Sequence, residues 1–231
     1  MYSATVQSRY TTRKGICLLN SCYKSGNYDV LYARYLKNAS QLVSQIKIGR
    51  RMSYVDLCGG TGAVSRELVK KGAVDITIVD LNWNMLKRAP INIKKIVANA
   101  EEWKPERRYD VVFCRQAITY LNLERLEKVI DSALKPGGFF VFNLIDTERS
   151  TIASMDHKAY ALDSKKYQEL TLILFGMAYH FQRSEKDGID LTSFRMYGRS
   201  DIESAFKNWD IRINHAPKAM YFILRKSRNK G

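Results

Sequence analysis

Short runs of β-branched and aromatic residues alternate with amphipathic stretches from residue 53 onward. The apolar runs lie at 53–57, 74–80, 92–98, 109–114 and 139–145. Helical spacing of apolar residues recurs between them, at about 62–71, 82–89 and 123–135. Strands that alternate with helices predict an α/β fold with a parallel sheet and crossover helices. Pro136-Gly137-Gly138 is expected to end the third of these helices, because proline and glycine interrupt helices.

The pattern changes after Asp146. Extended runs at 171–182 and 189–197 flank Lys-Asp-Gly, and Asp-Gly favours the tight turn of an antiparallel hairpin. Ser200, followed by Glu203, predicts a capping box that opens a helix at 201–207. Two further runs, at 209–215 and 219–226, predict an antiparallel strand pair that closes the sheet.

The first fifty residues have a helical pattern over 28–46 and precede the strand region. We therefore expect an N-terminal helical cap at 1–50 and a second unit at 51–231, with an insertion and hairpin at about 146–198. The predicted fold class is a doubly wound, Rossmann-like, mostly parallel sheet with an antiparallel C-terminal strand pair.

Composition and charge narrow the class of protein. The apolar runs are too short to span a bilayer and the N-terminus lacks a signal-peptide apolar region, which predicts a cytoplasmic protein. Four cysteines without a CxxC pair predict neither a disulfide framework nor a zinc site, and we expect no metal.

The net charge of +15 is concentrated at the two ends of the chain. Residues 55–198 hold 21 Lys/Arg against 19 Asp/Glu, whereas 1–54 hold nine against one and 199–231 hold eight against three. Such an excess indicates nucleic acid, anionic lipid or an acidic small substrate as partner, with a solvated lysine-rich surface as the alternative.

The strongest chemical signal is VDLCGGTGAVSREL at 55–68, where an acid at a strand end meets a glycine-rich turn and then a helix. Glycines let a ligand approach the backbone closely, and the helix N-terminus offers unpaired N–H groups. A dinucleotide fingerprint would place a third glycine where Ser65 stands, which disfavours NAD. Asp56 has a simpler alternative role, capping the helix that follows it.

DLCGGTG (56–62) resembles the first motif of the class I S-adenosylmethionine-dependent methyltransferases, with Cys58 where glycine is commonest. Asp80, 24 positions after Asp56, matches the acid that in this family holds the ribose hydroxyls, since one carboxylate accepts from two adjacent hydroxyls. ANAEEW (98–103) takes the place of the adenine-binding turn. The resemblance covers about 53–145 and implies S-adenosylmethionine as cofactor. The implied cofactor-binding residues are Asp56, Gly60, Gly62, Asp80, Asn99, Ala100, Arg115 and Gln116.

Candidate catalytic residues lie at the strand ends and beyond residue 146. Arg115 and Gln116 are expected to face the methionine end of the cofactor. Asn143 is polar within an apolar run and needs a hydrogen-bond partner, either structural or in a substrate. Tyr179 and His180 are neighbours in a predicted strand and so point to opposite faces. An aromatic face stabilises a sulfonium, and histidine acts as a base near neutral pH, with packing as the alternative for both.

Three functions fit this reading. The first is N- or O-methylation of a small molecule by an S-adenosylmethionine-dependent methyltransferase. The second is cyclisation of the cofactor to azetidine-2-carboxylate and methylthioadenosine, because FCRQAITYL, FVFN and a later tyrosine resemble a subgroup that includes such cyclases. RNA methylation is the third: the charge favours it, but CRQA stands where an NPPY-like tetrapeptide is expected. The sequence does not indicate an oligomeric state.

Overall fold

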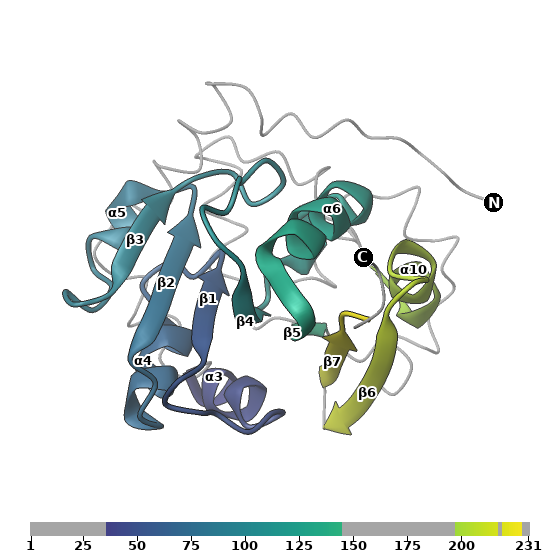
Figure 1. The fold of residues 1–231 in the computed structure, drawn as a ribbon, viewed down its shortest axis with the longest axis horizontal. Coiled ribbons are helices and arrows are strands. Elements are labelled where there is room, and N and C mark those ends of the chain that lie inside the picture. Colours follow the sequence, from purple (N-terminus) through teal and green to yellow (C-terminus); the bar gives the residue numbers. More distant parts are fainter. Residues whose placement is uncertain (1–35, 145–196, 217–218, 228–231) are drawn as a thin grey trace, which may run out of the picture.

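The computed structural model describes residues 36–144, 197–216 and 219–227. Seven strands form one sheet in the order β3-β2-β1-β4-β5-β7-β6 (Figure 1). In chain order they are β1 (Ser53–Leu57), β2 (Asp75–Asp80), β3 (Lys94–Val97), β4 (Tyr109–Cys114), β5 (Leu134–Leu144), β6 (Asp210–Ala216) and β7 (Ala219–Arg225). The first five strands run parallel, and β7 lies antiparallel between β5 and β6. The predicted fold class, with its antiparallel C-terminal pair, is confirmed.

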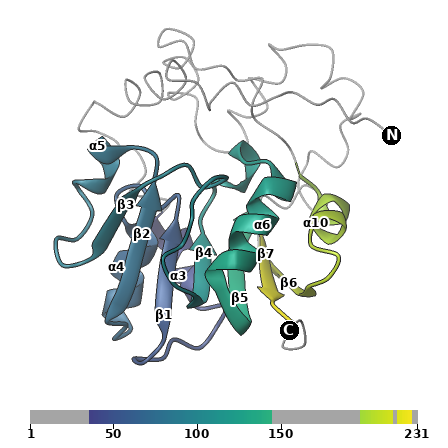
Figure 2. The same cartoon turned by 45° about the horizontal axis from the view of Figure 1, so that its top comes forward.

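Helices cover both faces of the sheet (Figure 2). They are α3 (Leu36–Val43), α4 (Ala63–Lys70), α5 (Trp83–Leu86), α6 (Leu123–Ala133) and α10 (Arg199–Ala205), with a 3₁₀ turn at Ile118–Tyr120. Buried residues of α3, α4 and α5 form one core cluster with one face of the sheet, and those of α6 and α10 form a second cluster on the other face. Each cluster removes an apolar helix stripe from water, which holds the layers together.

The end of α6 differs from the prediction. The helix stops at Ala133, and Leu134 is already extended and opens β5, so Pro136 and the two glycines lie in the strand instead of ending the helix. A residue before proline is disfavoured in the helical conformation, which moves the boundary toward the N-terminus. Backbone hydrogen bonds join Gly137 and Gly138 to Lys226, the residue after β7.

The start of α10 also differs. The helix begins at Arg199, with Gly198 as its N-cap, so the predicted capping box of Ser200 and Glu203 is wrong. Asp201 takes the carboxylate role instead and accepts the Gly198 N–H at 2.8 Å, while Glu203 pairs with Arg199. Two acids two residues apart leave the frame of a capping box ambiguous in sequence.

Part of the predicted organisation lies outside the described residues. This holds for residues 1–35 of the predicted cap and for the predicted hairpin at 171–197, apart from Tyr197. Within α3, which belongs to the predicted cap, Ala39, Leu42 and Val43 are buried in the core cluster of their sheet face. The division at residue 50 stays a prediction.

Candidate functional site: the carboxyl edge of the parallel strands

Three neighbouring parallel strands end level with one another. Leu57 of β1 is in register with Val79 of β2 on one side and with Cys114 of β4 on the other. The loops that follow these strands therefore open at the same edge of the sheet. Ligands of doubly wound folds bind in the crevice outside the carboxyl ends of the strands, so this edge is the candidate site.

The glycine-rich turn follows β1 at this edge. Gly60 has a φ of 54° and Gly62 a φ of 81°, in the left-handed region that favours glycine. A Cβ on Gly60 would lie 3.2 Å from Cε of Met85 and 4.0 Å from Oδ2 of Asp80, so a side chain there would fill the space beside that carboxylate. The glycine backbone therefore lies directly beside the Asp80 carboxylate, with no side chain of residue 60 between them.

Asp80 closes β2 and is held by the backbone around it. Its Oδ2 accepts the Gly60 N–H at 2.8 Å, and its Oδ1 accepts the Asn82 N–H at 2.8 Å. Burial raises the pKa of Asp80, and these hydrogen bonds oppose that rise by stabilising the charged form. The Leu81 N–H also donates to this half-buried carboxylate, which stands at the end of β2 where the resemblance implies an acid that holds the ribose hydroxyls.

Asp56 lies beneath the turn and is only 1% exposed. Its Oδ2 accepts the backbone N–H of Ser65 at 3.0 Å and the Ser65 hydroxyl at 2.8 Å. Burial raises the pKa of Asp56 to about 6, against the opposing effect of the Ser65 hydrogen bonds and the Arg115 charge. The structure thus gives Asp56 its alternative role as a helix cap, and any contact with a cofactor stays a prediction. Sequence analysis missed the role of Ser65, although its place in the motif marked it.

Two non-glycine residues at this edge have left-handed backbones. They are Cys58, with a φ of 55°, and Gln116, with a φ of 54°. If β1 continued, the side chain of Cys58 would point to the face opposite Leu57. Both side chains instead pack with the same core cluster, because the left-handed backbone at Cys58 turns its side chain back toward that face. A hydrogen bond with the Cys114 thiol, followed by burial, holds the pKa of Cys58 well above its usual range. Such a thiol stays protonated and unreactive at neutral pH.

Asn143 supports the loop after β4. It is 4% exposed, and its Oδ1 accepts the backbone N–H of Gln116 at 3.2 Å. Nη1 of Arg115 donates to Oε1 of Gln116 at 3.3 Å. The structure therefore brings these three predicted site residues together and provides the structural partner that a buried asparagine needs. A catalytic role for Asn143 remains a prediction.

The turn after β3 is fixed by side chains. Oδ1 of Asn99 accepts the Glu101 N–H at 3.0 Å, while Ala100 beside it is buried. Glu101 is buried too, and its Oε1 accepts the N–H of Asn122, which caps α6. The predicted adenine-binding turn is thus tied to the loop before α6. Sequence analysis missed this link, because a glutamate in a polar run gives no sign of being buried.

Tyr179 and His180, the other two predicted catalytic residues, lie outside the described residues. Within the part of the chain that the structure describes, no cluster of three or more His, Cys, Asp or Glu side chains is arranged to hold a metal ion. No described helix has the length and apolar character needed to cross a membrane.

A parallel sheet extended by an antiparallel pair, with a glycine turn facing an acid at its carboxyl edge, is the arrangement expected of a class I S-adenosylmethionine-dependent methyltransferase. Residues 28–213 match the sequence family described as "Methyltransferase domain". The chain belongs to this family, which confirms the enzyme class implied by the resemblance.

Individual proteins agree with this assignment. The chain is 27% identical over 110 residues to malonyl-[acyl-carrier protein] O-methyltransferase 2 of Ilyobacter polytropus, a match that spans 42% of each protein. It superposes on the DhpI–SAH complex with a TM-score of 0.61 at 19% identity, covering 94% of this chain and 99% of that one. Magnesium protoporphyrin IX methyltransferase from Synechocystis PCC 6803, with bound SAH, gives a TM-score of 0.55 at 12% identity and covers 95% and 97%. At these identities the two solved structures establish similarity of fold.

Proposed function

We propose that this enzyme transfers the methyl group of S-adenosylmethionine to a nitrogen or oxygen atom of a small molecule. The main support for S-adenosylmethionine as cofactor is the Asp80 carboxylate, which accepts hydrogen bonds from the backbone N–H groups of Gly60 and Asn82. It offers two acceptor oxygens at the edge where this fold class binds ligands. When bound, S-adenosylmethionine supplies a methyl carbon activated by the adjacent sulfonium.

The chain's own residues bind and orient. Asp80 accepts the ribose hydroxyls, and the backbone at Gly60 and Gly62 lets the ligand approach closely. Asn99 and Ala100 line the adenine side. Arg115 and Gln116 face the methionine end, where the Asn143 side chain holds the Gln116 backbone in place. Binding energy at this edge fixes one reactant, so methyl transfer needs mainly a second reactant held in line and a dry site.

The acceptor side involves the segment between β5 and α10. Residues 145–196, which contain Tyr179 and His180, belong to the connection between the end of β5 and the start of α10. We place the acceptor beside this segment. Because neighbouring side chains of a strand point to opposite faces, one of the two faces the acceptor: either Tyr179 against the sulfonium or His180 receiving the proton that a hydroxyl or ammonium loses. Because the proposed site includes this segment, the test uses all 231 residues.

The names of two relatives point to small reacting groups. The first is named for a malonyl group that is carried on a protein, and the second, named for magnesium protoporphyrin IX, supports a free small molecule. The chain spans only 42% of the length of the first, so its substrate is not carried over as such. None of the relatives described above is named as a cyclase or as an RNA methyltransferase.

The test uses S-adenosylmethionine labelled in its methyl group. Purified protein is incubated with this cofactor and either a cell extract filtered to remove macromolecules or the retained RNA and protein fraction. Mass spectrometry should show the label in a low-mass product, together with S-adenosylhomocysteine. The Asp80→Asn variant serves as a matched control and should give little product. Label found only in the macromolecular fraction would contradict the proposal.

A third incubation contains the cofactor alone. Formation of methylthioadenosine and a cyclic amino acid would replace methyl transfer by the cyclase function. Each of the three incubations detects a product of S-adenosylmethionine. If the acceptor class is wrong, the product appears in a different incubation. If the cofactor is wrong, no product appears in any of them.

A further inference from the structure

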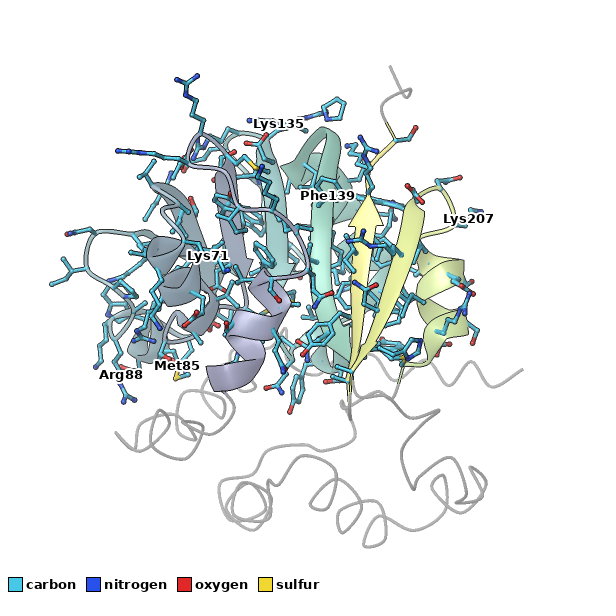
Figure 3. All side chains as sticks on the ribbon, turned by 90° about the horizontal axis from the view of Figure 1, so that it is seen from below. Lys71, Met85, Arg88, Lys135, Phe139 and Lys207 are labelled. Carbon is cyan, nitrogen blue, oxygen red and sulfur yellow. The ribbon has the colours of Figure 1, made fainter. Side chains whose placement is uncertain are left out.

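Two adjoining hollows lie at the end of the sheet opposite the cofactor edge. The first has a volume of about 520 Å³ and is lined by Lys47, Arg212 and Arg225 over an apolar floor that includes Phe139. The second has a volume of about 550 Å³ and is lined by Lys207 together with the same Arg225. Figure 3 shows Phe139 and Lys207 at this end of the molecule, away from Met85 and Arg88.

Sheet register explains why these cations gather. Arg212 of β6 is paired with Ile223 of β7, and Arg225 lies two residues further along β7, so both side chains project from the same face. Arg225 lies over the Phe139 ring of β5, with its guanidinium carbon 5.7 Å from the ring centroid. In the described part of the chain, α3 is the nearest helix on this face, and Gln45 just beyond it lines the first hollow. Among the described residues, no helix lies over β7 and β6 on this face (Figure 3).

The charge of the two hollows is poorly compensated. Neither Lys47 nor Lys207 forms an ion pair with another described residue, and Arg212 donates to the backbone carbonyl of Gln45 rather than to a carboxylate. Asp210 lines both hollows opposite Arg225 in the strand register, and it is the one carboxylate among their described lining residues, against the four cations Lys47, Lys207, Arg212 and Arg225. Lys226 also lines the second hollow, but Asp131 pairs with it at 2.9 Å.

We infer that these hollows form a docking surface for a single-stranded nucleic acid, with the cations along its sugar-phosphate backbone. The occupant is extended rather than compact, because the two hollows share Arg225 and form one continuous strip. A single strand fits better than a duplex, since its flexible backbone can follow a concave, positively charged surface.

This surface is separate from the proposed methyl-transfer site. Phe139 and Asn143 are four residues apart in β5, which corresponds to about 13 Å along a strand. The strip therefore anchors the enzyme on a nucleic acid while the carboxyl edge stays accessible. The inference does not depend on the small-molecule acceptor and extends the function beyond it.

The test compares two variants of the full chain with equal loss of charge. The first carries Lys47→Gln, Lys207→Gln and Arg212→Gln. The control carries Lys71→Gln, Lys104→Gln and Lys128→Gln, three exposed lysines on other elements. Binding to a fluorescein-labelled 20-nucleotide RNA and to the DNA of the same sequence is measured by anisotropy from 50 to 200 mM KCl. Thermal unfolding and S-adenosylmethionine affinity, measured alongside, show that each variant is folded and still binds cofactor.

Phosphate contacts release counterions, with a slope of log K against log salt of about −0.7 per contact for single strands. For the variant with three substitutions in the strip, this slope should therefore be less steep than in the wild type by about 2. For the control variant the slope should change much less. Equal losses in both variants would show diffuse attraction and overturn the inference, as would no binding by the wild type at 50 mM KCl. A poly-glutamate peptide and phosphatidylserine vesicles are the competing partners. If either binds as tightly as RNA with the same dependence on the strip, the surface recognises an acidic protein or a membrane instead.

Discussion

The backbone N–H of Gly60 donates a hydrogen bond to Oδ2 of Asp80 at 2.8 Å, which ties the glycine turn after β1 to the end of β2. The other oxygen of the same carboxylate is held by the Asn82 N–H, also at 2.8 Å. The side chain proposed to bind the ribose is therefore also the one that orders the turn beside it. Cofactor affinity and loop order depend on the same atoms.

Replacing Asp80 by asparagine should weaken S-adenosylmethionine binding strongly. An amide has one acceptor oxygen, so its NH₂ group must face the N–H of either Gly60 or Asn82. Hydrogen bonds to charged groups contribute about 1.5–3 kcal/mol each, and 1.4 kcal/mol corresponds to a tenfold change in affinity. We expect Kd to rise at least tenfold in isothermal titration calorimetry. Asn84→Ala, outside this contact, is the control, and unchanged affinity in the Asp80→Asn variant would remove Asp80 from the site.

At position 58, glycine should give a more stable protein than alanine, which reverses their usual order of stability. In ordinary helices and strands glycine is less stable than alanine by about 0.5–1 kcal/mol. At the φ of 55° found for Cys58, an alanine Cβ is strained by about 1–2 kcal/mol and glycine is not. Urea unfolding should therefore find the Cys58→Gly variant more stable than Cys58→Ala by about 1 kcal/mol. Ala39→Gly, in the middle of α3, should lower stability in the same assay. If Cys58→Ala were the more stable of the two, the backbone at this position could not be left-handed.

The sequence predicts the parallel strands well because each is an uninterrupted apolar run, and β1 and β4 have the predicted bounds. It assigns Gly60 and Asp80 to one cofactor site through the family resemblance, and the structure joins them by a hydrogen bond. It fails where a boundary depends on one hydrogen bond, as at Asp201 in α10. It also misses Glu101, whose burial depends on a long-range contact with the Asn122 N–H.

Asn143 should prove structurally important whatever its role in catalysis. Asn143→Leu is similar in size but leaves the Gln116 N–H without its acceptor, and a buried unpaired group costs about 1–3 kcal/mol. Chemical denaturation should show a loss of free energy of unfolding in this range, and S-adenosylmethionine affinity should fall with it. Asn143→Asp retains an oxygen toward Gln116 and should recover cofactor affinity to a greater extent. A leucine variant with wild-type stability would mean that the 3.2 Å contact does not hold the loop.

Asp56 should make the protein less stable as the pH rises from 4 to 6. Burial raises its pKa to about 6 in the folded state, whereas an exposed aspartate has a pKa of about 3.9. Between these pH values the folded protein keeps a proton that the unfolded chain has released, so the free energy of unfolding falls with increasing pH. At 1.36 kcal/mol per pH unit the contribution is roughly 3 kcal/mol. Asp56→Asn keeps an acceptor for Ser65 and does not ionise, so it lacks this contribution. In urea titrations at pH 4, 5, 6 and 7, the free energy of unfolding of the variant should rise relative to that of the wild type by about this amount. A difference that stays constant with pH would show that the folded protein does not raise the pKa of Asp56.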